Sequence, residues 1–160
     1  IGFLGEFLTL TRGTGVMHRL FHSYAPYKGS IPARRTGVIV STEKGEAVAY
    51  ALWNLEERGA LFIAPGTKVY PGMIIGEHSR ASDLDVNPLK GKQLTNVRAA
   101  GKDDNVQLSP PVKLSLEAAL AYIADDELVE VTPKSIRLRK RVLDANARRK
   151  AEKRAAQAEA

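Results

Sequence analysis

Short β-rich runs separated by proline and glycine constrain the fold of this chain more than any other feature of its sequence. Between residues 36 and 77, runs rich in valine, isoleucine and aromatic residues alternate with turn sequences. The runs are 36–42, 61–63, 68–70 and 73–77, and the later turns are Ala64-Pro65-Gly66 and Pro71-Gly72. Strands this short and this regularly spaced are typical of an antiparallel sheet or a partial barrel.

Further strands are predicted on either side of this region. Apolar and polar residues alternate at 128–131 and 135–138, which predicts two strands around Thr132-Pro133. Glu43-Lys44-Gly45 predicts a hairpin turn with glycine at a position of positive φ. The segment 47–57 is ambiguous and fits a continued strand that becomes a short helix over 52–57, ending at Arg58-Gly59.

Helices are predicted where capping residues precede apolar residues at helical spacing. Ser115 is a predicted N-cap for a helix that ends at Ile123, and Asp144 is a predicted cap for a basic terminal helix. Residues 2–10 also show helical spacing, and glycines follow them as stop signals. After these glycines, the imperfect alternation of apolar and polar residues at 16–24 predicts a strand. Together these elements indicate an α+β fold.

Positive charge is concentrated in two segments of a chain whose formal net charge is +6. Residues 134–160 hold ten Lys or Arg against three acids, and residues 86–102 hold four basic residues and no acid. Unpaired basic segments on a nearly neutral body indicate a polyanionic partner. The alternative is an ordinary solvated surface.

The first basic segment lies within residues 85–104, a long stretch with weak periodicity, and a loop of this length in a compact domain is usually functional or mobile. Lysine and arginine neutralise phosphates, and arginine and asparagine also donate to base edges or 2′-hydroxyls. We therefore predict that this loop contacts RNA. Its candidate residues are Lys90, Lys92, Asn96, Arg98 and Lys102.

The second candidate surface is the strand that enters the basic terminus. Alternation places Arg137 and Arg139 on the face opposite the apolar anchors, with Lys140 and Arg141 where the strand ends. We predict that these four residues also contact RNA. The alternative is charge balance against the acids at 125–130, and both interpretations can hold together.

The sequence gives little support for a catalytic site, a metal site or a membrane-spanning segment. The sequence has no phosphate loop of the form G-x-x-x-x-G-K-S/T, no cysteine and no long apolar run. His18 and His22 are four residues apart, but no third ligand is nearby, so we predict no metal site. The acids at 125–127 and Glu130 are expected to face water or to pair with Arg137 or Arg139. We predict no catalytic residue, no bound cofactor and no membrane contact.

Several stretches resemble a known family of translational GTPases. Residues 2–15 resemble the second half of the elongation-factor-G-like domain V. Three later regions are similar to the BipA/TypA family in particular. They are Leu61-Phe62-Ile63 with Pro65-Gly66, Val69-Tyr70 and Gly72 to Glu77; Lys92-Gln93-Leu94-Thr95-Asn96-Val97-Arg98-Ala99; and Asp126 to Pro133 running into Ile136-Arg137-Leu138-Arg139-Lys140-Arg141.

The resemblance implies a division of the chain. Residues 1–28 would be half of a ferredoxin-like domain V, and 29–143 the mainly antiparallel C-terminal domain of the family, with a few short helices. Residues 144–160 would be a basic helical or disordered tail. The chain begins with Ile1 rather than methionine, which we interpret as a fragment whose GTP- and Mg-binding domain lies upstream.

The resemblance also implies partners. In this family the C-terminal domain binds the ribosome near the A site and reaches toward transfer RNA through a flexible loop, which is 83–101 here by position. We therefore expect a cytoplasmic, non-catalytic region that contacts large-subunit ribosomal RNA and A-site transfer RNA, with roles in translation, large-subunit assembly and stress. No DNA contact is expected. The alternative is a protein-interaction or structural domain without RNA contact.

Overall fold

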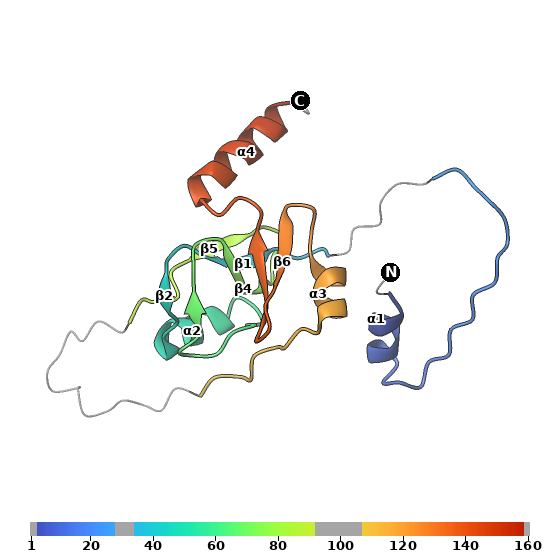
Figure 1. The fold of residues 1–160 in the computed structure, drawn as a ribbon, viewed down its shortest axis with the longest axis horizontal. Helices are drawn as coiled ribbons and strands as arrows, with labels where there is room; N and C mark the ends of the chain where they lie inside the picture. Colours follow the sequence, from blue (N-terminus) through green and yellow to red (C-terminus); the bar gives the residue numbers. More distant parts are fainter. Residues whose placement is uncertain (1–2, 28–33, 92–106, 159–160) are drawn as a thin grey trace, which may run out of the picture.

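The computed structural model describes residues 3–27, 34–91 and 107–158 (Figure 1). Its centre is a five-stranded sheet in the order β5-β1-β4-β7-β6, and every neighbouring pair is antiparallel except β1 with β5. The strands of this sheet are β1 (Val38–Ser41), β4 (Met73–Glu77), β5 (Leu84–Val86), β6 (Glu127–Val131) and β7 (Ile136–Lys140). A small second sheet pairs β2 (Gly45–Glu46) with β3 (Lys68–Val69). The predicted α+β class is confirmed.

Strand β1 lies in the middle of the core because it carries apolar residues on both faces. Ile39 joins one apolar cluster, whereas Val38 and Val40 join another on the opposite face. Helix α2 (Ala49–Glu56) contributes Leu52 and Leu55 to the first cluster. Helix α3 (Leu116–Tyr122) contributes Ala119 to the second. The sheet is therefore covered by one short helix on each face.

The predicted hairpin at Glu43-Lys44-Gly45 is wrong. Strand β1 pairs with β4 and β5, so both of its edges are occupied and β2 pairs with β3 instead. Gly45 is not among the glycines of positive φ. Its missing side chain makes room for Leu89, since a Cβ there would lie 2.3 Å from Leu89 Cδ2. In the ambiguous segment 47–57, the helix expected over 52–57 is present but begins earlier, as α2 over Ala49–Glu56, and no strand precedes it in this segment.

The later elements follow the sequence closely. The predicted strands around Thr132-Pro133 are β6 and β7, paired in register from Glu127↔Lys140 to Val131↔Ile136. Ser115 caps α3, where its Oγ accepts from Ala118 N at 3.2 Å. Asp144 caps α4 (Ala145–Ala158) by accepting from Ala147 N at 2.7 Å. By contrast, the predicted strand at 61–63 is a single bridge from Leu61 to Gly76.

The N-terminal segment is a helix followed by an extended chain. Helix α1 (Phe3–Leu10) is confirmed, and it ends where Arg12 and Gly13 adopt φ of 51° and 79°. The predicted strand at 16–24 is wrong, because 14–27 form no strand and leave Leu20 and Tyr24 94% and 96% exposed. A strand needs a paired neighbour, and the described chain offers none here. Neither apolar cluster includes a residue of 3–27.

Candidate nucleic-acid interface

Lys140, a predicted RNA contact, is buried in a cluster of charged side chains and is only 2% exposed. Its Nζ lies 2.5 Å from Asp83 Oδ2, 2.7 Å from Asp126 Oδ2 and 3.0 Å from Glu127 Oε1. Burial by itself would lower the pKa of Lys140, but hydrogen bonds to these carboxylates outweigh it and the pKa is raised. The ammonium is therefore charged and fully satisfied inside the protein.

Glu127 is the other centre of this cluster. Its side chain is fully buried, and Arg34 donates to both carboxylate oxygens, at 2.7 and 2.9 Å. Burial would raise the pKa of Glu127, but hydrogen bonds from Arg34, the Ala124 amide and Lys140 outweigh it and the pKa is lowered. The expectation that the acids at 125–127 face water or pair with Arg137 or Arg139 is wrong for Glu127.

These contacts correct the predicted interface. Lys140 alternates with Arg139 along β7 and so points to the buried face with Leu138, where no phosphate can reach it. Asp83, Asp126 and Glu127 lie close enough together to hold a cation, and the Lys140 ammonium occupies that position. Sequence reasoning missed Arg34 and Asp83, which are distant in sequence and carry no motif.

Arg137 and Arg139 lie on the opposite face of β7, as the alternation predicts, and both are half-buried. Arg137 is directly opposite Glu130 on β6. The Tyr70 hydroxyl donates to Glu130, and burial followed by this hydrogen bond raises the pKa of Tyr70 to about 12. Neither Arg137 nor Arg139 forms an ion pair among the described residues, so the charge balance of the alternative interpretation is not seen as direct contacts. Arg141, at the end of the strand, is exposed and has no ion pair within the described residues.

The two stems of the basic loop are anchored on the body of the domain. Pro88 is fully buried and its carbonyl accepts from Val48 N at 3.0 Å, while Leu89 packs against the first apolar cluster. On the returning side, Leu108 packs against the same cluster. Lys90 is exposed immediately beyond the first stem. The other loop candidates, Lys92, Asn96, Arg98 and Lys102, lie outside the described residues.

Helix α4 adds a basic element that is tied to the sheet at its first turns. Arg148 pairs with Asp85 of β5, and its Nη1 donates to the carbonyls of Leu143 at 2.8 Å and Val142 at 3.1 Å. Arg149 Nη2 lies 3.2 Å from the other Asp85 oxygen. Beyond these contacts the helix extends away from the five-stranded sheet (Figure 1). Its exposed cations are Arg149, Lys150, Lys153 and Arg154.

The histidines lie apart from these surfaces. His18 and His22 are exposed on the extended N-terminal segment, and His78 is buried with its Nδ1 2.5 Å from the Ser82 carbonyl oxygen. Among the helices of the described part of the chain, none is long and apolar enough to cross a membrane.

Comparison with known proteins agrees with the resemblance in the sequence. A family model described as the TypA/BipA C-terminal domain matches residues 36–145. The chain is 55% identical over 152 residues to a protein of Salmonella typhimurium named large ribosomal subunit assembly factor BipA. Proteins of the same name from Haemophilus influenzae and Escherichia coli K12 are 54% and 53% identical over the same length.

Each of these matches covers 94% of the chain but 25% of the relative, so the chain spans about a quarter of the length of the curated relatives it matches. The family model spans the whole five-stranded sheet, from β1 to β7, and both short helices that cover it. The chain therefore belongs to the TypA/BipA family and contains its C-terminal domain.

Proposed function

We propose that this chain is the RNA-contacting C-terminal region of a ribosome-associated translational GTPase that acts in translation and in assembly of the large ribosomal subunit. Family membership supports the proposal, as do relatives named large ribosomal subunit assembly factor. GTP and Mg²⁺ binding are proposed for parts of the longer protein outside this chain, and the protein is proposed to be cytoplasmic.

The observation that carries the proposal is the anchoring of the basic loop. Pro88 and Leu89 on one stem and Leu108 on the other pack against the body, so both ends of the loop have fixed positions. The segment between residues 86 and 102 contains four basic residues and no acid. A polyanion that reaches these stems would meet basic residues that neutralise phosphates and release counterions. We propose large-subunit ribosomal RNA and A-site transfer RNA as the partners.

The proposed interface extends beyond the loop but excludes Lys140. Its loop residues are Lys90, Lys92, Asn96, Arg98 and Lys102, and Arg137, Arg139 and Arg141 of the β7 region are added to them. The exposed cations of α4 complete the surface. Arg137 and Arg139 are expected to contribute less than Arg141, because they are half-buried and Arg137 faces Glu130.

The division of the chain near residue 28 is part of the same proposal. Residues 1–28 are assigned to the elongation-factor-G-like domain V, 29–143 to the family's C-terminal domain and 144–160 to a basic tail. The apolar face of α1 supports this assignment, since Phe3, Leu4 and Leu8 are exposed and suited to pack against the remainder of a domain V.

The direct test is binding of the 160-residue chain to purified large ribosomal subunits over a range of salt concentrations. The triple variant K90A/K92A/R98A should weaken binding roughly tenfold or more at moderate salt. It should also reduce the slope of log affinity against log salt by about two to three, because each phosphate contact contributes somewhat less than one unit.

A matched triple variant, K44A/R58A/K68A, removes the same charge at exposed positions outside the proposed surface. It should bind nearly as the parent chain does. If the two triple variants lose equal affinity, the attraction is general and the loop assignment is wrong. Binding that is insensitive to salt and requires a protein component would instead favour the protein-interaction alternative.

A further inference from the structure

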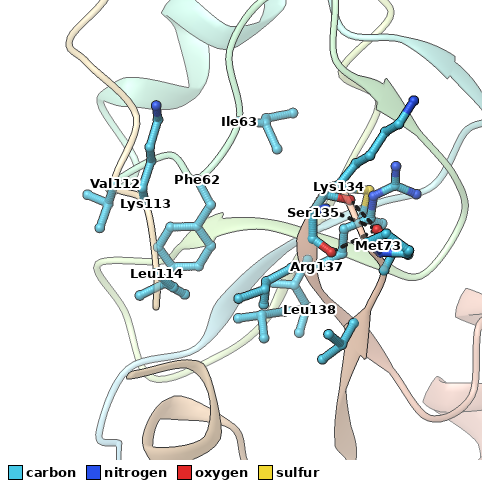
Figure 2. A pocket seen from close by; sticks show the side chains of 15 residues that line it. Phe62, Ile63, Met73, Val112, Lys113, Leu114, Lys134, Ser135, Arg137 and Leu138 are labelled. Atoms are coloured by element: carbon cyan, nitrogen blue, oxygen red, sulfur yellow. Dashed lines mark hydrogen bonds between the residues drawn. The ribbon is translucent and has the colours of Figure 1, made fainter. Parts of the chain in front are cut away.

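The five-stranded sheet divides next to β7 and leaves a groove. Strand β4 pairs with β7 only through Met73↔Arg139 and Ile74↔Leu138. Further along, β4 turns to residues 60–62 instead, where Phe62 N donates to Ile75 O at 2.9 Å. Because β4 leaves β7 at this point, a groove with a volume of about 660 Å³ opens between the first half of β7 and the segment that carries Phe62 (Figure 2).

The groove combines an apolar lining with a cationic rim. Figure 2 shows Phe62 and Leu114 on one side and Ser135, Arg137 and Leu138 on the other. Its charged lining residues are Lys113, Lys134 and Arg137, and no acid of the described part of the chain lines it. Its apolar lining includes Phe62, Leu114, Ile136 and Leu138. An occupant that suits it is apolar in the middle and anionic at its ends.

The wall of the groove formed by β7 also presents backbone groups. Lys140 N donates to Gly72 O at 2.8 Å, so the backbone N–H and C=O groups of Lys140 point toward β4. Because these directions alternate along a strand, the backbone groups of Leu138 and Ile136 point the same way. Leu138 is the last of these residues with a β4 partner. The N–H and C=O of Ile136 therefore face the groove beyond the end of the ladder, where an added strand would find one donor and one acceptor.

These features favour a peptide over a nucleic acid. A single-stranded nucleotide is usually held by a free aromatic face. Phe62 is half-buried and forms a T-shaped pair with Tyr122, with ring centroids 5.6 Å apart, so part of its surface is already covered. A strand edge beside pockets for alternate side chains is instead the arrangement by which folded domains bind extended peptides.

We propose that this groove binds an extended peptide from a protein partner, apolar at alternate positions and flanked by carboxylates, which adds to β7 at Ile136. The carboxylates meet Lys113, Lys134 and Arg137, and the alternate apolar side chains fill the space between Leu114 and Ile136. This site shares Arg137 with the proposed RNA surface but does not depend on it, because Lys113 and Lys134 supply the rest of its positive rim.

The test uses the 160-residue chain and a fluorescent synthetic peptide with a core of alternating valine and threonine and two glutamates at each end. Saturable binding is expected, with a shift of the Ile136 amide resonance in an NMR spectrum. The variant K113E/K134E should weaken binding on the order of tenfold. The same variant should bind a peptide with lysines in place of the glutamates more tightly than the parent chain does.

The control variant K44E/K68E carries the same charge change at exposed lysines away from the groove and should bind as the parent does. A peptide with proline at the centre of the core should bind more weakly, since it lacks a backbone donor. The proposal is overturned if no saturable binding occurs up to about 1 mM or if K113E/K134E binds as the parent does. It is equally overturned if an oligouridine shifts the Ile136 amide and displaces the peptide.

Discussion

At the scale of single residues, Glu127 connects the paired strands β6 and β7 to Arg34, which is distant in sequence. It accepts from Arg34, which lies 93 residues earlier, and from Lys140 on the neighbouring strand. Breaking a buried pair by removing one partner leaves an uncompensated charge in the interior, which typically costs about 3–5 kcal/mol. We therefore predict that Glu127→Gln lowers the free energy of unfolding by roughly that amount, measured by urea denaturation.

The control for this prediction is Asp125→Asn, which removes a carboxylate from the same turn. Asp125 is exposed and takes part in no ion pair in the part of the chain that the structure describes. Its substitution should change the free energy of unfolding by less than about 0.5 kcal/mol. Equal losses in the two variants would mean that Glu127 contributes no more than a surface acid.

The same carboxylate predicts a dependence of stability on pH. The pKa of Glu127 is lower in the folded than in the unfolded chain, because hydrogen bonds from Arg34, Ala124 and Lys140 outweigh burial. Its contribution is complete above the unfolded pKa and is lost as pH falls through the folded pKa. The parent chain should thus lose stability below about pH 4.5, whereas Glu127→Gln should lose less over the same range. Urea midpoints measured against pH would reveal the difference, and parallel profiles would contradict it.

At the scale of elements, features set by neighbouring residues, such as helix caps and strand alternation, were predictable from the sequence. The pairing of strands, which depends on distant residues, was not. Ser115 and Asp144 act as predicted caps, and alternation identified β6, β7 and the facing of Arg137 and Arg139. The prediction of a hairpin at 43–45 was wrong because β1 pairs with β4 and β5, whose residues lie much further along the chain. The prediction that Lys140 contacts RNA was wrong for the same reason, since one of its carboxylate partners, Asp83, lies far earlier in the chain.

The contact between helix α4 and Asp85 predicts a change in ribosome affinity opposite to the one expected from net charge. Asp85→Asn removes the partner of Arg148 and Arg149 and makes the chain more positive. If charge alone governed binding, this variant would bind large ribosomal subunits more tightly. We predict weaker binding, because α4 loses the contact that orients its cations, together with faster amide hydrogen exchange in its first turns. Glu57→Gln, which makes the same charge change at an exposed position, should not weaken binding.

At the scale of the whole molecule, the chain uses its cations in two ways. Lys140 is buried and Arg34 is partly buried, and both pair with carboxylates of the domain; the Lys140–Glu127 pair joins β7 to β6. Lys90, Arg141 and the outer residues of α4 remain exposed around the same body. A high count of basic residues therefore overstates the surface available to a polyanion. Burial, which composition does not reveal, decides which cations belong to it.

The last prediction concerns the independence of the sheet from the N-terminal segment. Neither apolar cluster includes a residue of 3–27. Deleting residues 1–28 should therefore leave the free energy of unfolding within about 0.5 kcal/mol of the parent value, measured by urea denaturation. The shortened chain should also scatter less light at high concentration, because the deletion removes the exposed Phe3, Leu20 and Phe21.

Two substitutions serve as controls for the free energy of unfolding of the shortened chain. Phe21→Ser changes an exposed side chain of the deleted segment and should leave stability unchanged, whereas Leu52→Ala opens a cavity in the first apolar cluster and should cost about 2–5 kcal/mol. A deletion that behaved like Leu52→Ala would mean that residues 1–28 pack against the sheet in solution. The division of the chain near residue 28 would then be wrong, because a separate domain contributes its own core and not that of its neighbour.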